Sequence, residues 1–175
     1  PRADAAVTRA PGVVLAVRVA DCVPVMLCDR AGSVVGIAHA GWRGLAAGVL
    51  ENAVAAMACD PATLLAWLGP SIGASAFEVG PDVRTAFVSA DSAAAGAFAP
   101  GRPGRWHADL AALACQRLAR AGVTDINNAR FVYAQMLASP RLAADVRAIA
   151  PQIEGRVGII HLDRHIDMQE RDMDE

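Results

Sequence analysis

Along the chain, hydrophobic residues form either short valine-rich runs or longer segments in which they recur at helical spacing. Residues 12–20, 23–29 and 34–40 are β-branched apolar runs and predict three strands, the last two joined as a hairpin by the turn "DRAGS". After the glycines of "GWRG", residues 45–58 carry apolar side chains at helical spacing, and Pro61 ends that predicted helix. The first third of the chain therefore has the pattern of strand, glycine turn and helix.

The second half of the chain continues this mixed pattern. It predicts, in chain order, a strand at 63–69, a helix at 81–90, a surface loop at 91–105, a helix at 107–122 and the start of a strand at 123–126. Gly122 is expected to be the C-cap of the last helix. Together these elements predict one domain of the α/β class, with α+β as the alternative, in which about three helices partly cover a layered mixed β-sheet.

Composition and charge indicate which kinds of binding partner the chain is expected to have. With 175 residues and 54% hydrophobic content, the chain can form one domain with a sizeable core. Its formal net charge is −2 and its basic residues are scattered singly, so the sequence predicts neither a nucleic-acid partner nor a membrane anchor. Four cysteines at irregular spacing without a signal-peptide pattern predict reduced thiols in a cytoplasm. A small-molecule partner is favoured, and the oligomeric state stays open.

Reactive side chains gather in "ADCVPVMLCDRAGSVVGIAHAGWRG", residues 20–44. Cys22 stands beside Asp21 at one end of a predicted strand, and His39 lies at the end of another, just before a glycine turn. If the two are close in space, the imidazole can hold Cys22 as a thiolate, or the pair can ligate Zn²⁺ or copper. The alternative is that Cys22 is a small core residue and His39 a hydrogen-bonded residue at a strand end.

The heptad "HAGWRGL" adds a candidate anion site. Gly41 and Gly44 flank Trp42 and Arg43 at the predicted start of a helix, where free backbone N–H groups attract an anion. The guanidinium of Arg43 supplies a fork of donors suited to phosphate or carboxylate. The alternative is that the glycines allow a tight turn and Arg43 pairs with a core aspartate.

These motifs, taken together, resemble one family. "ADCVPVML", "HAGWRG", "LGPSIG", "FEVGPDV", "ADLAAL" and "AGVTDI" follow one another over about residues 4–127, as in the laccase-domain family. Members were first labelled multicopper polyphenol oxidases and are described as purine nucleoside phosphorylases. The resemblance implies a metal site, with zinc as the metal and copper as the alternative, for which Cys22 and His39 match two ligands. The resemblance implies that the third ligand is a histidine in a glutamine-valine-histidine stretch N-terminal to the "AD" segment, which we do not expect this chain to contain.

The resemblance also implies an activity. Similar proteins cleave adenosine, inosine and methylthioadenosine with phosphate to free base and ribose 1-phosphate, and deaminate adenosine. We expect Arg43 and the N–H groups after Gly41 to bind the phosphate. Phe77, which stands where the family commonly has tyrosine, is a candidate for stacking on the base, with Glu78 beside it. Asp21 is a candidate partner of a metal ligand or a base, with a strand-end cap as the alternative.

Three other functions compete with phosphorolysis. In a Cys–His hydrolase or amidase, Cys22 would attack and His39 would be the base. A copper phenol oxidase is the older family description, but one cysteine and one histidine fall far short of a multicopper centre. A truncated, non-catalytic remnant is the third. Among the other candidates, His107 is expected at a helix entrance rather than on a metal, and packing is expected for Cys28, Cys59 and Cys115.

The end of the chain carries a different pattern. In "GRVGIIHLDRHIDMQERD", period-two alternation puts four candidate metal ligands on one face of a predicted strand: His161, Asp163, His165 and Asp167. This pattern resembles the manganese motif of the ureohydrolases, the agmatinase and guanidinobutyrase group. We therefore expect two parts, an N-terminally truncated laccase-like domain at 1–128 and a divergent tail at 129–175. The alternative is that the four side chains bind nothing.

Overall fold

The computed structural model describes residues 3–128, whose strands form two sheets. The larger sheet has the strand order β1-β3-β2-β4-β8. All its neighbouring strands are antiparallel except β4 and β8, which are parallel, so the sheet is mixed as predicted. Its strands are β1 (Ala5–Thr8), β2 (Val23–Asp29), β3 (Val35–Ala40), β4 (Leu64–Leu68) and β8 (Asp125–Asn128).

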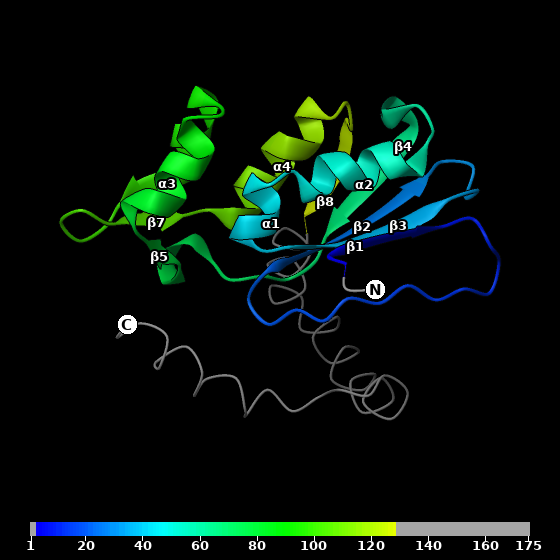
Figure 1. Ribbon diagram of the computed structural model, residues 1–175, viewed down its shortest axis with the longest axis horizontal. Helices are drawn as coiled ribbons and strands as arrows, with labels where there is room; N and C mark the ends of the chain where they lie inside the picture. The colour runs from blue at the N-terminus through cyan, green and yellow to red at the C-terminus, as the bar shows by residue number, and fades with distance from the viewer. Residues whose placement is uncertain (1–2, 129–175) are drawn as a thin grey trace, which may run out of the picture. The chain divides into compact units, whose positions relative to one another are not determined.

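Three helices lie on one face of this sheet, as Figure 1 shows: α1 (Trp42–Ala46), α2 (Val49–Met57) and α4 (Leu110–Arg120). The fourth helix, α3 (Pro81–Val88), packs against a smaller antiparallel sheet of β5 (Glu78–Val79), β7 (Trp106–Ala108) and β6 (Phe98–Pro100). Three 3₁₀ helices complete the elements: Pro61–Thr63, Ala74–Ala76 and Ser92–Ala97. The α/β class with helices covering a mixed sheet is confirmed. Over residues 3–128, no helix is both long and apolar enough to span a membrane.

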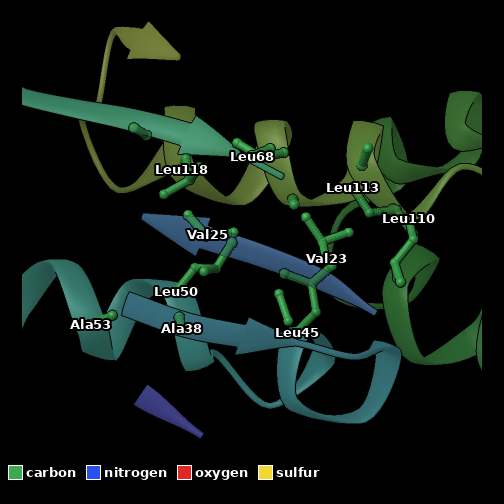
Figure 2. Close-up of a cluster of buried hydrophobic side chains, with 14 of the residues drawn as sticks. Val23, Val25, Ala38, Leu45, Leu50, Ala53, Leu68, Leu110, Leu113 and Leu118 are labelled. Carbon is green, nitrogen blue, oxygen red and sulfur yellow. The ribbon is translucent and has the colours of Figure 1, made fainter. Parts of the chain in front are cut away.

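The core lies between the larger sheet and the helices. Alternate residues of β2, namely Val23, Val25 and Leu27, are buried under the helices. Figure 2 shows Val23 and Val25 with side chains from β3, β4, α1, α2 and α4. Each such side chain contributes about 1.5–3 kcal/mol on burial, so this layer fixes which way β2 faces. The other residues of the strands lie on the opposite face, where Met26 is 43% and Val35 40% exposed.

The prediction of a strand at 12–20 is wrong. β3 pairs with β2 along one edge and with β1 along the other, so residues 12–20 do not form the neighbour of β3. In this stretch, alternate side chains are half-buried, namely Leu15, Val17 and Val19. This alternation resembles that of a strand, although the segment forms no ladder hydrogen bonds. The strand beside β3 is instead β1, in a stretch for which the pattern predicted no element.

Other boundaries also differ from prediction. The helix expected at 45–58 is divided into α1 and α2, because Gly48 between them has φ of +89°. The loop expected at 91–105 contains a 3₁₀ helix and β6. The C-cap of α4 is Ala121, and Gly122 directly after it has φ of +91°; the N–H groups of Gly122 and Val123 donate to the last carbonyls, so the prediction that a glycine ends this helix is confirmed. The predicted tail at 129–175 lies outside the described residues.

The hairpin turn between β2 and β3 is built on a buried carboxylate. Asp29 accepts hydrogen bonds from the backbone N–H and hydroxyl of Ser33, both at 2.6 Å, and from the N–H of Val34 at 3.1 Å. The Ser33 hydroxyl is the largest cause that lowers the pKa of Asp29, and the two backbone N–H groups add to it. The ionised carboxylate therefore stabilises the turn that aligns the two strands.

We expect Asp29→Ala to lower the urea midpoint of unfolding at pH 7. Because the pKa of Asp29 is lower in the folded chain, its contribution is complete above the ordinary aspartate pKa of about 3.9 and is lost as pH falls through the folded value. The difference in midpoint between the two proteins should therefore shrink below pH 4. Ser33→Ala should reproduce part of the loss. A difference independent of pH would contradict this account.

Candidate functional site

The register of the hairpin brings Cys22 and His39 together. Val23 pairs with Ala40 and Pro24 with His39, so the start of β2 lies beside the end of β3. Cys22 is the residue before β2, and it therefore falls next to the glycine that follows β3. Since Ala38 and Ala40 point into the core, His39 lies on the face of the sheet that the helices leave uncovered. The expected proximity of the two side chains is observed.

Gly41 leaves the space that the two side chains share. A Cβ added at Gly41 would lie 3.0 Å from Cys22 Sγ and 3.7 Å from both Cε1 and Nε2 of His39. The thiol and the Nε2 atom therefore border one small space, which a methyl group would fill. Gly41 has φ of −71°, a value that any residue adopts, so glycine is needed here for room and not for backbone conformation.

The other ring nitrogen of His39 faces a carboxylate. His39 Nδ1 lies 3.2 Å from Asp4 Oδ1, and the backbone N–H of His39 donates to the carbonyl of Asp4 at 2.7 Å. Asp4 directly precedes β1, and the pairing of Ala5 with Ala38 brings Asp4 opposite His39. The imidazole is therefore held between a carboxylate on one side and the space beside Cys22 on the other.

A pocket of about 230 Å³ surrounds these groups, lined by Asp4, Cys22, His39, Gly41, Trp42, Arg43 and Gly44. Pockets that enclose drug-sized ligands measure about 300–1,000 Å³, so this space suits an ion or a phosphate better than a whole nucleoside. The guanidinium carbon of Arg43 lies 4.6 Å from the centre of the Trp42 ring. Arg43 is exposed, and no carboxylate of residues 3–128 forms an ion pair with it.

The loop after β4 fixes the start of β2. The N–H of Gly69 donates to the carbonyl of Pro24 at 2.8 Å, and the N–H of Ile72 donates to the carbonyl of Asp21 at 2.9 Å. A Cβ at Gly69 would lie 2.6 Å from Cγ of Pro24, so only glycine allows this approach. The motif "LGPSIG" thus holds the backbone on both sides of Cys22.

The chemistry of the donors fits part of a metal site. A cysteine sulfur and a histidine nitrogen are ligands of zinc and of copper, and both border the space beside Gly41. Partial burial raises the pKa of the Cys22 thiol, and the carboxylates of Asp21 and Asp4 raise it further. These negative groups favour a cation beside the sulfur. Within residues 3–128, no third His, Cys, Asp or Glu completes a metal-binding group.

The other predicted site residues lie apart from this pocket's lining. Phe77 packs against the core at the entrance to the small sheet. Glu78 accepts hydrogen bonds from the backbone N–H and the guanidinium of Arg102, which lower the pKa of Glu78 to about 2. His107 pairs with Glu78 across β7 and β5, and Asp21 is exposed. None of the four lines the pocket of Cys22 and His39.

The remaining described cysteines do not line this pocket. Cys59 and Cys115 pack against the core, in agreement with their predicted packing, and Cys28 is half-buried on β2. The four tail residues with the ureohydrolase-like pattern lie outside the described residues: His161, Asp163, His165 and Asp167.

Sequence reasoning missed Asp4 and the spatial function of Gly41. Asp4 became relevant only because β1, which had no predicted strand, pairs with β3. A signal was present in the polar–apolar boundary of "RADAAVT", where an acidic residue precedes a short run containing valine and threonine. The sequence pattern places Gly41 in a turn, whereas the structure shows that glycine is needed there because Cys22 lies directly across the hairpin.

Known proteins share both sequence and structure with this chain. It is 56% identical over 127 residues to a purine nucleoside phosphorylase of Xylella fastidiosa, which covers 73% of this chain and 49% of that protein. It is 54% identical over 125 residues to the purine nucleoside phosphorylase YfiH of Escherichia coli, covering 71% and 51%. The chain thus spans about half the length of these curated relatives.

Solved structures agree with this relationship. The crystal structure of the Neisseria meningitidis protein NMB0706 matches with a TM-score of 0.71 and 52% identity, over 72% of this chain and 52% of that one. The YfiH structure of Bacillus licheniformis matches with a TM-score of 0.68 and 32% identity, over 71% and 49%. The model of the multi-copper polyphenol oxidoreductase laccase family matches residues 1–135. Because that match covers most of the chain, this protein belongs to the multi-copper polyphenol oxidoreductase laccase family.

Proposed function

We propose that the chain carries the phosphate- and metal-binding part of a purine nucleoside phosphorylase. The observation that carries this proposal is the convergence of Cys22 Sγ and His39 Nε2 on one small space, beside the exposed guanidinium of Arg43. Relatives that are 54–56% identical are named purine nucleoside phosphorylases, which supports the same reaction here. Adenosine, inosine and methylthioadenosine are the proposed substrates, with phosphate as the second.

Zinc is the proposed metal, with copper as the alternative. Cys22 and His39 would supply two of its ligands, and the family's third histidine would belong to the part of the relatives that this chain does not span. When bound, the metal would act as a Lewis acid that polarises a reacting oxygen or lowers the pKa of a water molecule. A water activated in this way is also what deamination of adenosine requires, which is the second activity we propose to test.

Phosphorolysis defines what the residues of the pocket must do. An oxygen of phosphate forms a bond to C1′ of the ribose while the bond from C1′ to the purine nitrogen breaks. The electron pair of that bond leaves with the purine, which takes up a proton, and ribose 1-phosphate is the other product. Arg43 would hold the phosphate by paired N–H donors, and the backbone N–H groups after Gly41 would add to the same positive region. Phe77 remains the proposed stacking residue for the base.

The electrostatics of Cys22 argue against the Cys–His hydrolase. A nucleophilic cysteine needs a lowered pKa, because the thiolate is the attacking species. Here burial and the carboxylates of Asp21 and Asp4 raise the pKa of Cys22. The thiolate in this setting needs a cation beside it, so the same residues favour metal binding over covalent catalysis. The electrostatics of Cys22 therefore support the proposed metal site. They do not distinguish an active enzyme from a non-catalytic remnant, which the experiments below test.

We expect the 175-residue chain, supplied with zinc, to release hypoxanthine from inosine in a phosphate-dependent reaction. Cys22→Ala and His39→Ala should each reduce the rate by more than about 100-fold, since even the outer partners of a metal ligand contribute about 10- to 100-fold. Liquid chromatography of the purine and of ribose 1-phosphate measures the reaction. Adenosine as substrate separates phosphorolysis, which gives adenine, from deamination, which gives inosine.

Cys28→Ala is the matched control, because Cys28 lies on β2, the strand that directly follows Cys22, and outside the pocket. It should leave the rate near that of the unsubstituted chain. Release that persists in Cys22→Ala would refute the metal-site proposal. A folded chain that binds zinc but releases no purine, with every substrate and with phosphate present, would support the non-catalytic remnant.

We expect Arg43→Ala to raise the KM for phosphate by about tenfold or more, with a smaller change in the KM for inosine. The guanidinium is the cation of the pocket, and a charged hydrogen bond contributes about 1.5–3 kcal/mol. Arg43→Lys should restore part of the affinity, because it keeps the charge but not the fork of donors. Arg120→Ala, which breaks an ion pair with Asp91 at the end of α4, is the control. Equal effects on both KM values would contradict a phosphate-binding function.

We expect Gly41→Ala to abolish metal binding while the chain stays folded. The added methyl group would lie 3.0 Å from Cys22 Sγ in the space that the metal needs, and φ of −71° imposes no backbone strain on alanine. Isothermal titration with zinc measures the binding, and circular dichroism measures the fold. Gly96→Ala, at a position with open space around it, should bind zinc normally. Normal zinc binding by Gly41→Ala would refute the assignment of the site.

A further inference from the structure

The orientation of the His39 ring depends on a contact that lies outside the predicted ligand set. Among residues 3–128, Asp4 is the only acidic residue that lines the pocket, and its carboxylate faces Nδ1 of His39 at 3.2 Å. The opposite edge of the same ring, with Cε1 and Nε2, borders the space beside Gly41 and Cys22. The His39 ring therefore faces the Asp4 carboxylate with Nδ1 and the space beside Cys22 with Nε2.

The backbone holds Asp4 in this place. The N–H of His39 donates to the Asp4 carbonyl at 2.7 Å, which extends the β1–β3 ladder by one residue beyond Ala5 and Ala38. Because side chains of directly opposed residues in an antiparallel pair share a face, the Asp4 carboxylate and the His39 ring lie on the same side of the sheet. The contact thus follows from the register of the strands.

The contact has one consequence for the proton of His39. An ionised carboxylate only accepts hydrogen bonds, so the neutral imidazole that bonds to Asp4 must carry its proton on Nδ1. The lone pair is then on Nε2, the nitrogen that borders the space beside Cys22. A ring with the proton on Nε2 could not ligate a metal there.

We infer that Asp4 is a positioning residue of the metal site, which selects the tautomer and the orientation of His39 so that Nε2 can ligate the metal. This inference rests on the metal site of the proposed function. Asp4 itself does not complete a metal-binding group with Cys22 and His39 among the described residues, in keeping with an outer partner and not a third ligand. Histidine ligands of metals commonly donate their second N–H to a carboxylate in this way.

The test compares Asp4→Ala with Asp4→Asn in the 175-residue chain. Both variants remove the same negative charge, but only asparagine keeps an oxygen that can accept from Nδ1–H. The readouts are the dissociation constant for zinc, measured by competition with a chromophoric chelator, and the thiolate charge-transfer and d–d bands of the cobalt(II)-loaded chain. Backbone hydrogen bonding of residue 4 is unchanged in both, and circular dichroism verifies the fold.

We expect Asp4→Ala to weaken zinc binding by about 10- to 100-fold and to alter the cobalt d–d bands, while Asp4→Asn stays close to the unsubstituted chain. Equal weakening in both variants would show that charge alone acts and would overturn the positioning function. No weakening in either, or no cobalt–thiolate band in the unsubstituted chain, would overturn it as well. Because these readouts need no turnover, a chain that shows the expected pattern without releasing purine would refute phosphorolysis alone.

Discussion

The antiparallel register of β2 and β3 is the constraint on which the rest of the structure depends. Pairing of Pro24 with His39 decides both which side chains enter the core and which functional groups meet at the strand ends. A slip of one residue would turn Val23 and Val25 away from the helices and would separate Cys22 from Gly41. The burial of the valines and the assembly of the site therefore depend on the same alignment, which the carboxylate turn at Asp29 and the loop after β4 secure from opposite ends.

The parts of the fold that were predictable are those with strong local signals. The valine runs of β2 and β3, the helical spacing of α2 and α4, and the glycine at the end of α4 each carry their own information, and the structure agrees with them. The proximity of Cys22 and His39 followed because a short hairpin leaves little choice of geometry. Local patterns do not predict which strands pair with one another. Residues 12–20 have a better strand pattern than β1, yet it is β1 that pairs with the second edge of β3.

Asp4 shows why part of the site lay beyond local sequence reasoning. Nothing in its own neighbourhood links it to His39, since 35 residues separate the two and the contact exists only through the β1–β3 ladder. The small sheet shows the same limit, because its strands have two or three residues each and carry almost no periodicity. Glu78 meets Arg102 there as an ion pair, so a residue expected near the substrate has a partner of its own.

Because β1 lies at the edge of the sheet, the contact between Asp4 and His39 can open without unfolding of the whole domain. This segment has four residues, one neighbouring strand and a contact with α2, whereas β2 is paired on both sides and has its alternate residues buried in the core. Edge strands of this length open by fraying at a small fraction of the free energy that global unfolding requires. Each such opening would release the carboxylate from the imidazole and leave the hairpin and the core intact. The contact between Asp4 and His39 thus depends on the local opening of one short edge strand, which can differ from the stability of the whole domain.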